Sequence, residues 1–456
     1  MKYWQVCPLG PTGFGDSPYQ CFSAFAGNPY FIDLETLLAR NLLEQRDLAE
    51  LWRLPADRVD YGAQWVLRWR VLEKAFRTFI SNASRSERNE FAAFKKSKKE
   101  WLDPYIRFIA LKGKFDGRSW QFWPDEFRHY AKAKRSIAKS ELGDETEAQA
   151  WYQFQFFKHW LALKTYANSR DVQVFGDIPI FVAMDSADVW TNPGLFQMDP
   201  DLKPTGVAGV PPDYFAADGQ LWGNPLYDWP KHKATNYAWW LARLKASFEL
   251  YDVIRVDHFR GFDEYCKIPP NAANAREYEW LPGPGLDLFQ AIKTEFPEGK
   301  LVAEDLGIIT DSVRQLVKAA GVPGMKVLQF GFEGATEYLP HSGTPNFLLY
   351  PGTHDNDTAW GWFVKQSEPV KDFFRRYLRV AGDAVPWDMI RAGYASPCRL
   401  FIVPMQDLLS LGSDARMNTP GQAFGNWQWR MTRNQLDNLW NESAGYLKEL
   451  AKLYER

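Results

Sequence analysis

The sequence has little of what marks membrane, secreted or nucleic-acid-binding proteins. Its 456 residues include only 4 cysteines, Cys7, Cys21, Cys266 and Cys398, and none belongs to a CxxC pair. So few cysteines exclude a disulfide scaffold, and we expect a reduced, cytoplasmic protein. The formal net charge of -2 offers no basic surface to nucleic acid or to an anionic membrane. The sequence contains no run of about 18 apolar residues, so it predicts no membrane helix.

Metal and nucleotide motifs are absent from the sequence as well. The 6 histidines form no HxxxH or HxH set, and there is no GxxxxGK[ST] loop. We therefore expect a reaction that uses no metal and no cofactor. Aromatic residues, in contrast, are abundant, with 21 Trp, 20 Tyr and 32 Phe. The flat faces of Trp and Tyr suit sugar rings, although any single aromatic can equally belong to the core.

Short apolar runs that end in polar residues recur along the chain. They lie at 4–9, 172–182, 252–259, 301–307, 325–332, 346–356 and 400–407. Runs of this kind are typical of buried parallel strands, and the helical patterns between several of them predict an α/β fold. A (β/α)8 TIM barrel needs eight strands. Since the sequence supplies seven, we expect a barrel whose N-terminal first strand is missing.

Two long segments interrupt this alternation. Residues 34–168 show helical spacing of apolar positions and many charges, which predicts a helical insertion subdomain beside a barrel formed by 1–33 and 169–456. Residues 185–230 are rich in Pro, Gly and Asp and show little periodicity. We expect an irregular loop there that covers the active site and, through Tyr214, Trp222 and Tyr227, shields it from water.

Acidic residues stand at the ends of four of the predicted strands: Asp177, Asp257, Glu304 and Asp355. Barrel enzymes carry their catalytic groups at these strand ends. Burying an unpaired carboxylate costs folding free energy, so four at equivalent strand ends need an explanation. Structural explanations remain for single residues. Asp257 could pair with Arg255, Asp177 could cap a loop, and Asp355 could form an Asx turn. Together, the four favour a carboxylate-based active site.

Glycoside chemistry needs two carboxyl groups with different roles. In retaining enzymes one attacks the anomeric carbon and the other protonates the leaving oxygen, with the two groups about 5–5.5 Å apart. Arg255 would keep Asp257 ionised, whereas partial burial and neighbouring carboxylates would favour the protonated form of Glu304.

Longer motifs make the sequence similar to a known family. They include WQVCPLGPTGFGDSPYQ, GDIPIFVAMDSADVW, VIRVDHFRGF, AEDLG, GTHDNDT and ARMNTPGQAFGNWQWR. Over essentially its whole length the chain resembles the amylomaltases, which are 4-α-glucanotransferases related to the α-amylase clan. The resemblance implies that Asp257 is the nucleophile, Glu304 the general acid/base and Asp355 a third catalytic carboxylate. It implies substrate-binding roles for a further set of residues: Arg255, His354, Asp177, Tyr19, Trp222, Tyr214 and Asn224.

The expected reaction is transfer of a glucan segment to the 4-hydroxyl of another glucan or of glucose. Two alternatives stay open at this point, an α-glucan hydrolase and an inactive glucan-binding barrel. The expected partners are α-1,4-glucans, with no nucleic acid and no membrane, and the chain is expected to be a monomer or a weak homo-oligomer. His258, next to the predicted nucleophile, is expected to be structural because side chains alternate along a strand.

Overall fold

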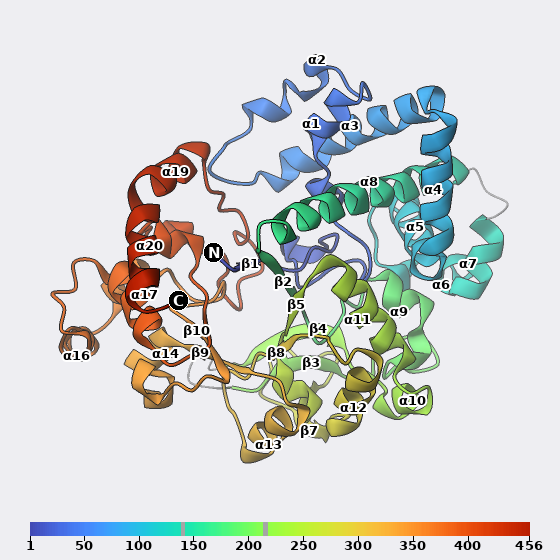
Figure 1. The fold of residues 1–456 in the computed structure, drawn as a ribbon. Helices are drawn as coiled ribbons and strands as arrows, with labels where there is room; N and C mark the ends of the chain where they lie inside the picture. Colours follow the sequence, from blue (N-terminus) through green and yellow to red (C-terminus); the bar gives the residue numbers. More distant parts are fainter. Residues whose placement is uncertain (138–141, 213–217) are drawn as a thin grey trace. The chain divides into compact units, whose positions relative to one another are not determined.

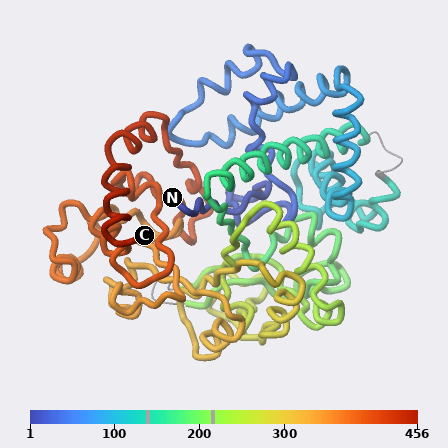
Figure 2. Tube along the Cα trace, viewed as in Figure 1, coloured from blue at the N-terminus to red at the C-terminus, as the bar shows by residue number. Residues whose placement is uncertain are grey.

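A computed structural model describes residues 1–137, 142–212 and 218–456 of the chain. These residues form two compact units. The first unit comprises Met1–Leu54 and Tyr61–Leu301, and the second comprises Pro55–Asp60 and Val302–Arg456. Figure 1 shows the elements of each unit as ribbons, and Figure 2 follows the same chain as a trace.

A parallel sheet forms the centre of the first unit. Its strands are β1 (Tyr3–Gln5), β2 (Gln173–Ile178) and β5 (Val253–Val256), and β2 pairs with both of the others. All four β5 residues and five of the six in β2 are buried. That explains why both strands read as continuous apolar runs in the sequence. β8 (Leu301–Ala303) carries the chain out of the first unit.

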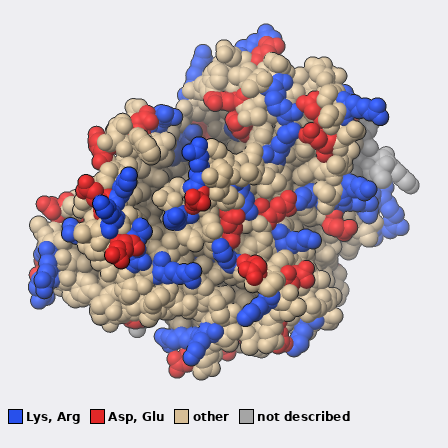
Figure 3. All heavy atoms as spheres, viewed as in Figure 1, with Lys and Arg blue, Asp and Glu red and all other residues tan. Residues whose placement is uncertain are grey.

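The described part of the segment 34–168 is mostly helical, as the sequence predicts, with short connections between the helices. Its α-helices are α1 (Leu34–Ala39), α2 (Gln45–Leu48), α3 (Tyr61–Asn82), α4 (Arg85–Ser97), α5 (Lys99–Lys114), α6 (Asp125–Arg128), α7 (Tyr130–Ile137) and α8 (Gly143–Asn168). The helices α3, α4 and α5 pack against α8 (Figure 2). Figure 3 shows acidic and basic side chains interspersed on the exposed helices, and ion pairs such as Lys95 with Glu147 join α4 to α8. Whether this segment is a separate domain stays a prediction.

A second, antiparallel sheet occupies part of the segment that the sequence predicts as an irregular loop. Its strands are β3 (Val207–Val210), β4 (Gln220–Pro225), β6 (Glu264–Ile268) and β7 (Glu279–Pro282), in the order β4-β3-β6-β7. The prediction of a loop over 185–230 is therefore wrong for β3 and β4, and α9 (Ala187–Thr191) also lies in this segment. Both strands are short, and Gly209 and Gly223 interrupt the alternation by which a strand is recognised.

The remaining helices of the first unit are α10 (Trp229–Ala234), α11 (Ala238–Leu250) and α12 (Leu286–Glu295). α11 precedes β5, and α12 lies between β5 and β8 in the chain, which gives the alternation expected of an α/β fold.

The second unit contains the other parallel strands. After β8 come β9 (Gly324–Val327), β10 (Phe347–Tyr350) and β11 (Leu400–Phe401), with β10 between its two partners. The helices are α13 (Asp311–Ala320), α14 (Leu328–Phe332), α15 (Ala359–Lys365), α16 (Glu368–Leu378), α17 (Val385–Ala395), α18 (Met405–Leu408), α19 (Arg433–Asn438) and α20 (Ala444–Leu453). Each of the seven predicted runs thus contains a strand. In the described residues, no helix has the length and apolar character needed to cross a membrane.

The first unit contains a cluster of aromatic side chains around Tyr227. Tyr227 is fully buried there and donates a hydrogen bond of 2.8 Å from its hydroxyl to the carbonyl of Ile180. Tyr227, which the sequence predicts as part of the segment that shields the active site, is instead enclosed by other aromatic side chains and offers no surface to a ligand. His232 lies in the same cluster, 5.2 Å from the Tyr227 ring, and is also fully buried. Burial disfavours the charged imidazolium and lowers the pKa of His232 to about 4.

His232 is expected to make the protein sensitive to acid. The unfolded chain binds a proton at His232 below pH 6.5, whereas the folded chain binds it only near pH 4. Stability is therefore fully present above pH 6.5 and falls by up to about 3 kcal/mol as the pH drops to 4. In melting experiments between pH 7 and pH 4.5, His232→Phe should lose less stability on acidification than the wild type. The exposed position His341 gives the control, His341→Phe, and identical pH dependence in all three proteins would contradict the prediction.

Candidate active site

The register of two parallel strands brings the first candidate residues together. Asp177 of β2 lies directly opposite Arg255 of β5. Asp257 follows β5 two residues after Arg255, so the two side chains point to the same side. A shift by one residue would turn the apolar neighbours toward this side instead, and the buried faces of both strands oppose such a shift.

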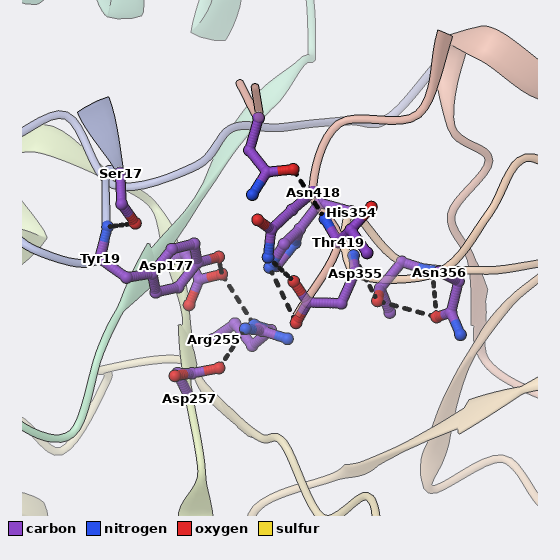
Figure 4. A network of polar contacts seen from close by, with 12 residues as sticks. Ser17, Tyr19, Asp177, Arg255, Asp257, His354, Asp355, Asn356, Asn418 and Thr419 are labelled. Atoms are coloured by element: carbon purple, nitrogen blue, oxygen red, sulfur yellow. Dashed lines mark hydrogen bonds and ion pairs between the residues drawn. The ribbon is translucent and has the colours of Figure 1, made fainter. Parts of the chain in front are cut away.

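Arg255 joins the two carboxylates (Figure 4). Its Nε donates a hydrogen bond of 2.8 Å to Asp177 Oδ2, and its Nη2 lies 2.5 Å from Asp257 Oδ1. Arg255 and Asp177 are 3% and 2% exposed, whereas the Asp257 side chain is 27% exposed. The guanidinium therefore neutralises a buried carboxylate on one side and leaves the accessible one oriented for reaction on the other.

Tyr19 adds a second donor to Asp177. Its hydroxyl donates a hydrogen bond of 2.7 Å to the same Oδ2 that Arg255 contacts. Burial, with the neighbouring carboxylate, raises the pKa of Tyr19, so it stays a neutral donor. The other oxygen, Asp177 Oδ1, is buried and accepts no hydrogen bond from any described residue. A buried carboxylate oxygen without a donor is one that a ligand hydroxyl could satisfy.

The β3–β4 segment supplies further residues near this group. Trp222 is half-buried on β4, and its ring meets that of His258 edge to face at 4.9 Å. Asn224 is buried, and its amide accepts from Gln20 Nε2 at 2.9 Å and donates to the carbonyl of Val182 at 2.8 Å. We therefore read Asn224 as an anchor of β4. The predicted substrate residue Tyr214 lies outside the described residues.

His258 is held in an unusual conformation. Its φ of 49° is left-handed, and the residue is half-buried in the turn before the short helix at Phe259–Phe262. Burial lowers the pKa of His258 to about 4, so the imidazole is neutral near pH 7.

In the second unit, Glu304 follows β8 directly. It is half-buried, and its Oε1 accepts a hydrogen bond of 3.0 Å from the amide of Leu306. This bond closes a tight turn, in which Asp305 lies between the two residues. The turn leaves the carboxyl group of Glu304 at the end of its strand, as the sequence predicts.

The loop after β10 carries His354 and Asp355. Thr353 and Asn356 fix it, since Asn356 Oδ1 accepts from the amide of Thr353 at 2.9 Å and from its hydroxyl at 3.0 Å. His354 Nε2 lies 3.5 Å from Asp355 Oδ2, and the ring of Trp427 lies 5.6 Å from that of His354. His354 and Asp355 therefore form a pair, as expected.

Asn418 completes this pair and was not predicted. Its Nδ2 donates a hydrogen bond of 2.6 Å to Asp355 Oδ1, and its own amide donates to the carbonyl of His354 at 3.0 Å (Figure 4). Arg416 holds Asn418 in place by donating from Nε to its carbonyl at 2.7 Å. The motif ARMNTPGQAFGNWQWR was the available signal, although it contains no strand or helix that would indicate where its side chains point.

The chain is similar to proteins of known function. Residues 1–436 match glycoside hydrolase family 77, described as 4-alpha-glucanotransferase. The chain belongs to the 4-α-glucanotransferase family. It is 45% identical to the 4-alpha-glucanotransferase of Thermus thermophilus, covering 100% of this chain and 92% of that protein. The corresponding enzyme of Clostridium butyricum is 41% identical, with coverage of 100% and 93%.

The fold of this 4-α-glucanotransferase family member is also that of a solved relative. An amylomaltase from Streptococcus agalactiae, in complex with acarbose, matches with a TM-score of 0.95 and 37% identity over 100% of this chain and 92% of the other. The predicted fold class, an α/β barrel of the TIM type with insertions, is confirmed by this similarity. The prediction that the chain is an enzyme that acts on α-glucans is confirmed by the family.

Asn418 should matter to catalysis through its hydrogen bond to Asp355. Replacement by alanine removes the bond, and we expect a loss of about 10-fold in transfer rate. Asn418→Asp has nearly the same shape but places a second carboxylate 2.6 Å from Asp355 Oδ1, so the loss should reach about 100-fold. Rates are measured as glucose release from maltotriose. The exposed residue Asn434 provides the control Asn434→Asp, and equal rates for both Asn418 variants would contradict the argument.

Proposed function

We propose that Asp257 and Glu304 perform glucan transfer by a double displacement with retention of configuration. The bridge from Asp177 through Arg255 to Asp257 is the observation that supports this best. It holds one carboxylate ionised, oriented and partly exposed at a strand end, which is what a nucleophile needs. The family supplies the reaction class, and the residue roles are our assignment.

In the first half-reaction, an Asp257 oxygen attacks the anomeric carbon of the donor glucan. The bond from this carbon to the bridging oxygen breaks, and Glu304 donates its proton to that oxygen. The products are a β-glucosyl ester on Asp257 and a free glucan with a new 4-hydroxyl end. Arg255 stabilises the carboxylate before attack and again when the ester bond breaks.

In the second half-reaction, the 4-hydroxyl of another glucan, or of glucose, attacks the same carbon. Glu304, now ionised, takes the hydroxyl proton, and Asp257 leaves as a carboxylate. The enzyme thus returns to its starting state, and the number of α-1,4 bonds does not change.

The remaining residues are proposed to hold the sugar. The unsatisfied Asp177 Oδ1 can accept a hydroxyl hydrogen bond, and Asp355 with His354 can grip two adjacent hydroxyls. Trp222 offers a half-buried ring face for stacking. The acarbose complex of the Streptococcus agalactiae relative supports a binding site of this kind for glucans.

Incubation with maltotriose tests transfer against the two alternatives. Transfer converts it to glucose and a ladder of longer maltooligosaccharides, while total reducing ends stay constant. A hydrolase would increase reducing ends in step with bond loss, and a binding protein would leave maltotriose unchanged. A rise in reducing ends equal to the glucose released would contradict the proposal.

Trapping the intermediate tests the assigned roles. An α-maltosyl fluoride needs no proton at its leaving group, so Glu304→Gln should still form the ester on Asp257 but break it at least about 1,000-fold more slowly. Mass spectrometry of the intact protein should show one added maltosyl group, and mass spectrometry after digestion should place it on a peptide that contains Asp257. Asp257→Asn in the same background should show none. The exposed Asp287 gives the matched control Asp287→Asn, in which labelling should persist, and a label that survives Asp257→Asn would contradict the assignment.

A further inference from the structure

The residue after Glu304 is also a carboxylate, and it is tied to the neighbouring strand. Asp305 is half-buried, and its Oδ1 accepts a hydrogen bond of 2.7 Å from the amide of Met325 in β9. On the other side of Glu304, the bond from the Leu306 amide closes the turn. The backbone on which Glu304 sits is therefore fixed both within the turn and across to β9.

Gly324 provides the space for this contact. A Cβ at Gly324 would lie 2.4 Å from Asp305 Oδ2 and 2.7 Å from Oδ1. These distances are far below van der Waals contact, so any larger residue would push the carboxyl group away. The carboxyl of Asp305 thus rests on the bare backbone of β9, and its position depends on a glycine at 324.

The surroundings of Asp305 contain groups that raise its pKa and groups that lower it. Burial raises the pKa of Asp305 to about 7, and repulsion from Glu304 adds to the rise, while the Met325 amide and Lys326 oppose it. Tyr338 also faces this group, because the charge of Asp305 contributes to raising the pKa of Tyr338. Lys326 is drawn toward the carbonyls of Glu337 and Ser342, to which its Nζ donates.

We propose that Asp305 is a positioning residue that anchors the turn carrying Glu304 to β9, so that the carboxyl group of Glu304 stands where it can donate a proton. The inference rests on the proposed function, in which Glu304 is the general acid. The hydrogen bond from the Met325 amide to Asp305 ties the turn to the neighbouring strand, and Gly324 leaves room for it. A general acid must lie within hydrogen-bond reach of the leaving oxygen, so a displaced turn should lower kcat more than it changes KM.

Asp305→Asn separates the charge from the anchor. The amide oxygen can still accept from Met325, so the turn should persist and the melting temperature should stay close to that of the wild type. Because the anchor remains, kcat for maltotriose should stay within about twofold of the wild type, whereas Asp305→Ala, which lacks the acceptor, should lose about 10-fold in kcat with little change in KM. A purely structural role would lower the melting temperature without this selective loss of kcat in the folded enzyme.

A double-mutant cycle tests the anchor. Gly324→Ala should displace the Asp305 carboxyl and lower kcat by about 10-fold in the wild-type background. In an Asp305→Ala background there is no carboxyl to displace, so the same change should cost less than about twofold. A Cβ added at Gly445, on α20, would meet no atom within 4 Å, so Gly445→Ala serves as the control with no expected effect in either background.

The possible results separate this inference from the proposed function. An active Glu304→Gln variant in the maltotriose assay would overturn the proposed function and this inference with it. An inactive Glu304→Gln, together with a wild-type kcat in a folded Asp305→Ala, would overturn the inference alone. Additive losses in the cycle would do the same. If Asp305→Asn fails to fold, the cycle built from Gly324→Ala and Asp305→Ala decides the matter.

Discussion

The candidate active site depends on one buried cation. Arg255 stands between Asp177 and Asp257, and both ion pairs follow from the register of β2 with β5. Without the guanidinium, the buried carboxylate of Asp177 would be uncompensated, a situation that costs several kcal/mol. The strand pairing that builds the core is thus the same pairing that orients Asp257, the proposed nucleophile. Changes to the β2–β5 register would harm stability and chemistry together.

The carboxylates of Asp355 and Glu304 are oriented by other kinds of contact. Asp355 is held by an amide donor from Asn418, and Glu304 by the backbone turn that Asp305 secures. In each of these contacts the group that donates to the carboxylate is a neutral amide. Neutral donors orient a carboxylate without the strong preference for the ionised form that a cation imposes. This difference agrees with a scheme in which Asp257 must stay charged while Glu304 must exchange a proton.

Much of the fold was predictable because buried parallel strands appear in the sequence as continuous apolar runs. All seven apolar runs contain a strand, and the acidic residues that follow β5, β8 and β10 stand where the barrel architecture puts catalytic groups. Asn418 was missed because its partner, Asp355, is 63 residues away and no periodic pattern connects them. The strands β3 and β4 were missed for another reason. Each is only a few residues long and carries a glycine, so alternation could not be distinguished from a polar loop.

The finding that β4 is a strand bears on how a transferase avoids water. The carboxylates serve hydrolysis and transfer equally, so the preference for a sugar must come from acceptor binding. Trp222 belongs to a paired strand, its indole nitrogen donates to Gln220 Oε1 at 3.1 Å, and the neutral His258 ring supports its edge. An aromatic surface held in this way loses little freedom when a glucose ring stacks on it, so more of the stacking energy is available for binding. An irregular loop without strand pairing, which the sequence predicted, would give the ring less support. We therefore propose that the preorganised ring of Trp222 favours a glucan over water in the second half-reaction.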